Sequence, residues 1–462
     1  MMKKELAAAL GISAAMVTKL ARRGMPTDDP VHLGTALDVL RDWARDIEIQ
    51  PASLERERKV VLEEWRRGRS VGERVAERQR AVLFEGTRYA DRLPIGLPDT
   101  IEHAPQAAIE RFYRDWYRPD AMAVIVIGDV DPTTVKSAIE ARFADLTNPT
   151  PSRPRIAGGV PPAAPTRVAI TADAELASTL VSVYDLLPHR SETTRGDFRR
   201  AVGEQLWTLI LAERFDILAR RPDCPFNGAS ADIDTLTRDI DMLRVSAEAK
   251  PGKADEALRA ILTELTRLER HGFTPGEIER ARAQFQRFYE NYDLGYETEP
   301  AATFADEVTR NFFEGEFMIG PAAEKDAALA ALPTITRADI EAVTRSFAES
   351  KRRSVLLSAP DEAKLPNKDA ALAIVAETMT ATIDPWKEDT SVGSLIDAPP
   401  TPGTITARKT IDAIGVTEWT LSNGAKVVVM PTEFQNDEIQ MSAFSPGGTS
   451  LVPDAARRRR SP

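Results

Sequence analysis

Residues Glu55 to Arg67 read E-R-E-R-K-V-V-L-E-E-W-R-R, a pattern typical of an amphipathic helix. Its apolar residues are the consecutive positions 60–62 and Trp65, and charged side chains fill the remaining turns. Glu57 and Glu64 are seven positions apart, or two helical turns, so both carboxylates point to the same side of the helix. One carboxylate could then bind a metal ion while the second supports it. The alternative is a solvated charged face on an ordinary helix, which is the usual meaning of a charge run.

Several motifs follow this helix along the chain. They are G-T-R-Y at Gly86–Tyr89, L-P-I-G at Leu93–Gly96, F-Y-R-D-W-Y-R-P at Phe112–Pro119 and A-V-I-V-I-G-D-V at Ala123–Val130. Taken together with the helix, they resemble the insulinase or pitrilysin family of zinc metallopeptidases, the inverzincins. Within that family the sequence looks most like the bacterial periplasmic-type proteases that are built from two halves. The resemblance covers about residues 26 to 450.

The resemblance implies roles for the two glutamates. In the family, an H-x-x-E-H helix supplies two histidine ligands and the general base, and a glutamate on a later helix is the third zinc ligand. Glu64 matches that ligand, and Glu57 matches an acidic residue that supports the site. Zinc would polarise the peptide carbonyl, and the base would take a proton from the bound water. The resemblance therefore implies Zn²⁺, a peptide or protein substrate and hydrolysis of peptide bonds.

The histidines of the chain do not complete this motif. The four histidines are at positions 32, 103, 189 and 271, and the sequence contains neither H-x-x-E-H nor H-E-x-x-H. A catalytic zinc site uses three protein ligands and leaves one position open. Glu64 alone is not such a site, so no catalytic residue is assigned, and we expect the chain to be inactive alone and not to retain zinc. His103 could approach a zinc ion, but a solvated histidine is the commoner case. The family places the motif further upstream than this chain has residues, so we expect that it was lost with the first part of domain one.

Composition limits the classes of function. The 462 residues are 42% hydrophobic and 28% charged, as in a soluble globular protein of about three domains. The net charge of −11 argues against general binding to nucleic acids or anionic membranes. The single cysteine, Cys224, excludes an internal disulfide and is expected to be a buried thiol. No apolar run is long enough to cross a membrane, and no signal-peptide core follows the first residues, so we expect a cytoplasmic protein as written.

The first residues carry a separate signal. Residues 5–23 contain a short Ala-rich helical pattern, a turn at Gly11 and a second helix that Ser13 could cap. This arrangement resembles a small helix-turn-helix, and the segment is locally basic. The alternatives are a DNA-binding segment and a non-native N-terminal fusion or mis-assigned start.

The order of the predicted elements divides the chain into several parts. We expect an α+β fold of homologous metallopeptidase-like domains, each an antiparallel-rich sheet with helices packed on one face. The expected parts are residues 1–24 (helix-turn-helix-like), 25–147 (trailing half of peptidase domain one), 148–166 (proline-rich linker), 167–360 (domain two, of the peptidase C-terminal type), 361–412 (tether) and 413–462 (start of domain three).

Periodicity and turn residues predict the individual elements. The expected helices are residues 28–47, 55–84, 105–117, 133–146, 193–221, 253–271, 274–292 and 336–349. The expected strands are residues 122–128 (buried), 167–171, 178–186, 227–235, 241–249, 354–359 and 444–451. Asn423-Gly424 also predicts a hairpin turn within residues 418–429.

Three functions remain open. The first is an insulinase-type zinc endopeptidase or a piece of one. The second is a non-catalytic partner subunit, which packs against a family member that carries the histidines. The third is a DNA-binding fusion through residues 5–23. An incomplete domain one would also leave a sheet edge uncovered, so we expect the isolated chain to associate unless a partner covers that edge.

Overall fold

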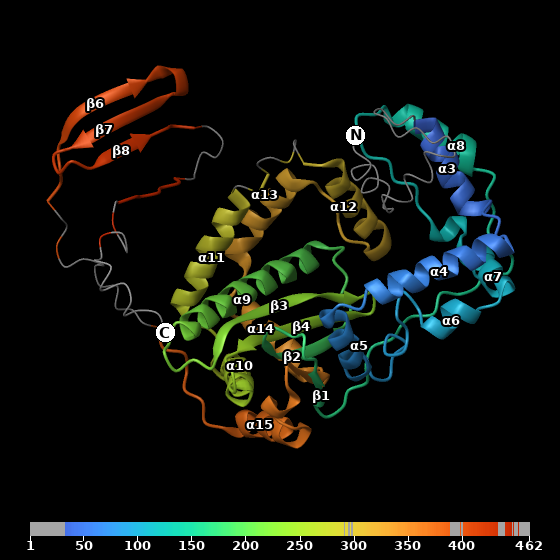
Figure 1. Ribbon diagram of the computed structural model, residues 1–462, viewed down its shortest axis with the longest axis horizontal. Coiled ribbons are helices and arrows are strands. Elements are labelled where there is room, and N and C mark those ends of the chain that lie inside the picture. Colours follow the sequence, from blue (N-terminus) through green and yellow to red (C-terminus); the bar gives the residue numbers. More distant parts are fainter. Residues whose placement is uncertain are drawn as a thin grey trace. The chain divides into compact units, whose positions relative to one another are not determined.

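The computed structural model describes residues 33–290, 299–388, 401–432 and 439–445, together with residues 292, 293, 296, 398, 447 and 451. The chain forms two units, Met1–Glu388 and Asp389–Pro462 (Figure 1). The helix-turn-helix-like segment expected at residues 5–23 lies outside the described residues. No helix in the described part is both long enough and apolar enough to cross a membrane.

Short helices make up the first part of unit 1. They are α3 (Leu33–Arg45), α4 (Pro51–Arg67), α5 (Val71–Leu83), α6 (Pro98–His103), α7 (Gln106–Trp116), the 3₁₀ turn η1 (Pro119–Ala121) and α8 (Pro132–Phe143). Most of the predicted helices are confirmed, but a single helix from Glu55 towards Phe84 is wrong. It ends at Arg67, and a new helix begins after Ser70, whose hydroxyl accepts a hydrogen bond from the N–H of Glu73. A serine that can cap a helix therefore interrupts the charged pattern.

The buried strand predicted at Met122–Gly128 is wrong. These residues form no strand, and Ala123, Ile127 and Gly128 are exposed. A strand needs a neighbour that pairs with its backbone N–H and C=O groups. In the described part of the chain before Arg167 there is no strand that could pair with it. Residues 122–128 do have the β-branched composition of a strand, but a strand forms only where a second strand pairs with it.

Five strands of unit 1 form one sheet in the order β1-β5-β2-β4-β3. They are β1 (Arg167–Ala172), β2 (Thr179–Pro188), β3 (Phe226–Thr237), β4 (Ile240–Ala249) and β5 (Arg353–Ala359). β1 and β5 are parallel, and the other neighbours are antiparallel. The strands predicted for this part of the chain are confirmed within about two residues, and the sheet is mixed with a single parallel pair.

In the part of the chain that the structure describes, helices lie between the strands of this sheet and after the last of them. They are α9 (Arg195–Ala219), α10 (Ala254–His271), α11 (Pro275–Glu290), α12 (Ala301–Glu314), α13 (Pro321–Ala331), α14 (Arg337–Glu349) and α15 (Lys368–Thr380), with 3₁₀ turns η3 (Leu332–Thr334) and η4 (Glu362–Lys364). Predicted helices correspond to α9, α10, α11 and α14. Residues 361–412 were expected to be a tether, but Lys368–Thr380 form the helix α15. Its residues Ala371, Ile374 and Val375 are buried in the main core.

Both faces of the sheet are covered. On one face, Trp207 and Phe215 of α9 pack in the main core with Val355 and Leu357 of β5. On the other face, Leu356 belongs to a smaller cluster with residues from the end of α5, because successive side chains of a strand point to opposite faces. The expectation that helices cover one face alone is therefore wrong. Helix α5 lies against β1 and β5 (Figure 1) and attaches the first part of the unit to the sheet.

Unit 2 contains a three-stranded antiparallel sheet in the order β6-β7-β8. Its elements are β6 (Ile405–Ile411), η5 (Asp412–Ile414), β7 (Val416–Leu421) and β8 (Lys426–Val429). The predicted hairpin turn is confirmed: Gly424 has a φ of 82°, and the Asn423 side chain accepts a hydrogen bond from the N–H of Ala425. β6 was not predicted. Of the strand expected over residues 444–451, positions 444 and 445 are not strand, and most of the rest lies outside the described residues.

Candidate functional site

Helix α4 carries the two glutamates that the sequence singles out. Glu57 and Glu64 are both exposed, and no residue of this helix is fully buried. Arg58 fixes the helix to its neighbour by donating hydrogen bonds to the carbonyls of Ile101 and Ala104, at the end of α6. Trp65 is half-buried, and its ring lies under a guanidinium 4.6 Å away. Glu57 and Glu64 thus lie on exposed positions of a helix whose other side is attached to α6.

The described histidines contact groups other than Glu57 and Glu64, although His103 belongs to α6, the helix that packs against α4. His103 is largely exposed and lies beside Asp99 of its own helix. His189 contacts Asp241 at 2.8 Å, and the His271 ring contacts the carbonyl of Ile383. Within the part of the chain that the structure describes, no group of three or more His, Cys, Asp or Glu side chains could hold a metal ion. These residues do not fit a zinc site by themselves, so the ligand role of Glu64 and the supporting role of Glu57 stay predictions.

Polar contacts of Arg74 and Asp239 help to attach the first part of unit 1 to the sheet and so position α4. Arg74 of α5 makes two hydrogen bonds to Asp173, at 2.7 and 2.8 Å, just after β1. Asp239, in the turn between β3 and β4, accepts hydrogen bonds from the Tyr89 hydroxyl and from the N–H groups of Gly158 and Gly159. These hydrogen bonds lower the pKa of Asp239 although its burial opposes this.

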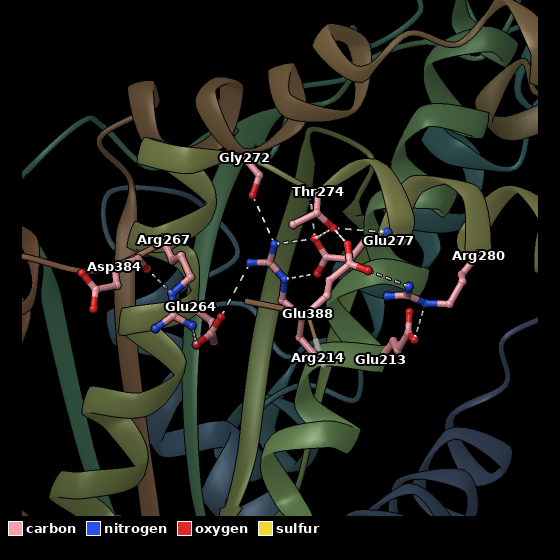
Figure 2. Close-up of polar contacts among 10 residues, drawn as sticks. All are labelled: Glu213, Arg214, Glu264, Arg267, Gly272, Thr274, Glu277, Arg280, Asp384 and Glu388. Atoms are coloured by element: carbon pink, nitrogen blue, oxygen red, sulfur yellow. Dashed lines mark hydrogen bonds and ion pairs between the residues drawn. The ribbon is translucent and has the colours of Figure 1, made fainter. Parts of the chain in front are cut away.

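The most deeply buried charges of unit 1 meet where α9, α10 and α11 come together (Figure 2). Arg214 donates from Nε and Nη2 to the carboxylate of Glu277, at 2.5 and 2.9 Å, and from Nη2 to the carbonyl of Gly272 at 3.1 Å. Glu264 Oε2 lies 3.7 Å from Nη1. All three charged side chains are at most 3% exposed. Sequence reasoning missed this cluster because its members are up to 63 residues apart.

The two glutamates of this cluster have opposite pKa shifts. Burial acts to raise the pKa of Glu277, but hydrogen bonds from Arg214 and Thr274 outweigh it, so the pKa is lowered. Burial raises the pKa of Glu264, although the charges of Arg267 and Arg214 oppose it. The cluster therefore joins three helices through buried charge.

Trp386 lies in the segment that follows α15 and packs against Arg214 of this cluster. Three guanidinium groups lie near its ring, those of Arg214, Arg267 and Arg221, at 5.0, 5.6 and 5.9 Å from the centroid. Cations are attracted to the face of an indole ring. The ring is 9% exposed, so this contact is shielded from water. A tryptophan within a segment otherwise rich in small and polar residues was the available sequence signal.

Residues on either side of Trp386 in the sequence make further polar contacts, which Figure 2 shows for Asp384 and Glu388. Glu388 accepts hydrogen bonds from Thr274 and from Arg280, the latter at 3.0 Å. The Arg267 Nε donates to the carbonyl of Asp384 at 3.0 Å. The segment of residues 381–388 is thereby fastened across α10 and α11.

Comparisons with known proteins agree with this architecture. A family model described as the peptidase M16 inactive domain matches residues 105–285. A zinc protease PQQL-like protein of Arabidopsis thaliana is 28% identical over 438 residues, which are 93% of this chain and 42% of the relative. The probable zinc protease PqqL of Haemophilus influenzae is 22% identical over 93% of this chain and 46% of the relative. The chain spans less than half the length of these two curated relatives.

Solved structures share the fold. The periplasmic protease PqqL from Escherichia coli has a TM-score of 0.72 at 20% identity, over 89% of this chain and 46% of that one. A mutant of the ferredoxin protease FusC, in complex with Arabidopsis ferredoxin, has a TM-score of 0.68 at 24% identity, over 88% and 45% of the two chains. The mixed sheet with its helices is thus the fold of M16 peptidase halves. The chain is a relative of the M16 peptidases, the insulinase family. Among them it is similar to the PqqL-like zinc proteases.

Proposed function

We propose that the chain acts in peptide hydrolysis as part of an M16-type zinc endopeptidase, and that it is inactive on its own. The supporting observation is the ligand count. Glu64 matches the family's carboxylate ligand, the sequence contains no H-x-x-E-H, and the described residues contain no group of three or more metal-binding side chains. A catalytic zinc site needs three protein ligands.

In this proposal a second polypeptide carries the H-x-x-E-H motif, and this chain is its non-catalytic partner in handling the substrate. The match to the family's inactive domain supports such a role. A protein or peptide is the proposed substrate class, since one structural relative is in complex with a protein, ferredoxin. No zinc-dependent step is assigned to residues of this chain.

The test compares zinc content and peptidase activity. The purified chain is assayed for metal by elemental analysis and for cleavage of a quenched fluorescent peptide library. We expect well below one zinc per chain and no cleavage above a blank. Glu64→Gln should behave as the parent does in both assays. Stoichiometric zinc, together with cleavage that a chelator stops and that Glu64→Gln abolishes, would overturn the proposal.

A further inference from the structure

An aromatic groove runs along the helical side of unit 1, between α9 and the helices α11 to α13. It consists of two cavities of about 540 and 530 Å³, which share Glu192, Ala201 and Gln205 in their linings. The lining of the first cavity includes residues 232–234 of β3, which is one of the two edge strands of the sheet. Because the cavities have lining residues in common, an extended ligand could occupy both.

Aromatic rings form the walls of this groove. Tyr289 lies in contact with Phe285 and Tyr292, with ring centroids 4.6 and 5.0 Å away. Phe198 and Phe317 meet edge to face at 5.1 Å in the second cavity. Such packed rings are held in place before a ligand arrives. Phe285 and Tyr289 are only 2% and 3% exposed and support the wall from behind, whereas Phe288 is 59% exposed and open to a ligand. Exposed aromatic faces attract cations, and guanidinium groups most often occupy them in proteins.

The charge of the lining is strongly unbalanced. The described residues that line the two cavities include nine aspartates and glutamates but a single basic side chain, Arg310. That arginine is already paired with Glu316 at 2.8 Å. Glu192 lies at the junction of the two cavities. Burial raises the pKa of Glu192, and the nearby Glu316 and Glu204 add to this while Arg200 opposes it.

Other lining carboxylates are already paired with arginines outside the lining: Glu204 with Arg190 and Arg200, and Asp232 with Arg244. The carboxylates of the lining still outnumber these arginines.

The geometry distinguishes between possible occupants. An anionic ligand would meet like charge, and a purely apolar ligand would cover the half-buried Glu192 carboxylate without giving it a partner. A bound divalent ion would need converging ligands at 2.0 to 2.6 Å or so. No group of three or more such side chains converges anywhere in the described part of the chain. A long basic side chain of a larger molecule fits these conditions. Its charged end would contact the carboxylates, and its apolar methylene groups would pack against the rings.

We propose that the aromatic groove binds a lysine- or arginine-bearing stretch of an extended polypeptide, with one basic side chain placed between the rings and Glu192. This rests on the proposed function in one respect, that the polypeptide is a substrate of the complete peptidase. The recognition itself requires neither zinc nor cleavage. Substrates would then be selected for basic residues at a distance from the hydrolysed bond.

The test uses fluorescence anisotropy with the full chain and a short, unstructured, fluorescein-labelled peptide that carries a pair of arginines. A second peptide has citrulline in place of both arginines, which keeps the shape and removes the charge. We expect the citrulline peptide to bind at least about tenfold more weakly. Affinity for the arginine peptide should also fall with added salt.

Three variants locate the binding site. Glu192→Gln removes the junction charge, and Phe288→Ala removes a ring of the first cavity that is 59% exposed and whose loss spares the core. Each should lower the affinity for the arginine peptide by about fivefold or more. Glu279→Gln is the matched control, because it removes one charge from an exposed position of the same helix as Phe288. It should bind as the parent does, and a thermal melt checks that each variant is folded.

Two results would overturn the proposal. Equal affinity for the arginine and citrulline peptides would show that charge is not recognised. An equal loss in Glu279→Gln and Glu192→Gln would show only general attraction to an acidic protein. Both differ from a failure of the proposed function, which is measured by zinc content and cleavage in the absence of any partner.

Discussion

The guanidinium of Arg214 and the carboxylate of Glu277 form a two-point ion pair inside unit 1, with N···O distances of 2.5 and 2.9 Å. Their side chains are 1% and 2% exposed. The pair connects α9 to the beginning of α11, where Glu277 also accepts the N–H of Thr274. A buried charge that loses its partner is costly because water cannot replace it. The relative placement of these helices therefore depends on a contact that substitution can test.

Glu277→Gln should destabilise the protein by about 3 kcal/mol, because Arg214 loses its two-point partner. Its remaining carboxylate partner is then Glu264, which lies 3.7 Å away and is shared with Arg267. Urea unfolding followed by circular dichroism measures the change. Glu279→Gln, on the same helix, is the control, since the Glu279 side chain is 73% exposed. Its effect should stay below about 1 kcal/mol. Similar losses in the two variants would contradict a special role for the buried pair.

Trp386→Ala should loosen the segment of residues 381–388. The ring contacts three guanidinium groups and is 9% exposed. Truncation of a buried tryptophan typically costs about 3–5 kcal/mol, and we expect the lower end because the segment is at the surface. Thermal melting and the rate of proteolytic cutting after α15 measure the effect. Trp386→Phe retains an aromatic face and should recover much of the loss; equal melts for the two variants would argue against the stacking contact.

Asp339 predicts a loss of stability in acid. It accepts hydrogen bonds from Arg199, at 2.5 and 3.0 Å, and from Thr336 at the start of α14. Hydrogen bonding from Arg199 holds the pKa of Asp339 well below its ordinary value of 3.8. A lowered native pKa stabilises the fold above the ordinary value, and that contribution is lost as pH falls below it.

The measurement is urea unfolding of the parent and of Asp339→Asn at pH values on both sides of 3.8. The parent should lose its advantage over the variant as pH falls, because protonation removes the same charge that the substitution removes. Asp42→Asn, at an exposed position of α3, is the charge-matched control. A gap between parent and Asp339→Asn that stays constant across this range would refute the expectation.

The sequence predicts local structure where local rules decide it. The strands β1 to β5 were found because β-branched runs between turn residues also have neighbours to pair with. Met122–Gly128 has the same composition, but a single chain segment cannot show whether a partner strand exists. Trp386 illustrates the same limit at the level of packing. Its three cationic neighbours come from α9, from the turn after it and from α10, more than 100 residues away in the sequence.

The candidate site divides in the same way. The helix that carries Glu64 was predicted from its periodicity, because a helical face depends on spacing alone. Whether Glu64 binds a metal depends on imidazoles that no spacing rule supplies for this chain. The aromatic groove could not be predicted either, since its lining comes from helices, a strand and the segments between them. Only folding brings those side chains together.

The residues from Met122 to Val130 predict association of the isolated chain. They line two cavities of about 540 and 490 Å³, and Ile127 and Val130 are 38% and 42% exposed. Exposed apolar side chains beside open cavities favour contact with another chain. Sedimentation velocity should show concentration-dependent oligomers, and Ile127→Lys should shift the distribution towards monomer because a charge opposes burial of this surface. Ile156→Lys, at an isolated isoleucine that is 67% exposed, should leave the distribution unchanged. A parent chain that stays monomeric at every concentration would show that this stretch needs no partner.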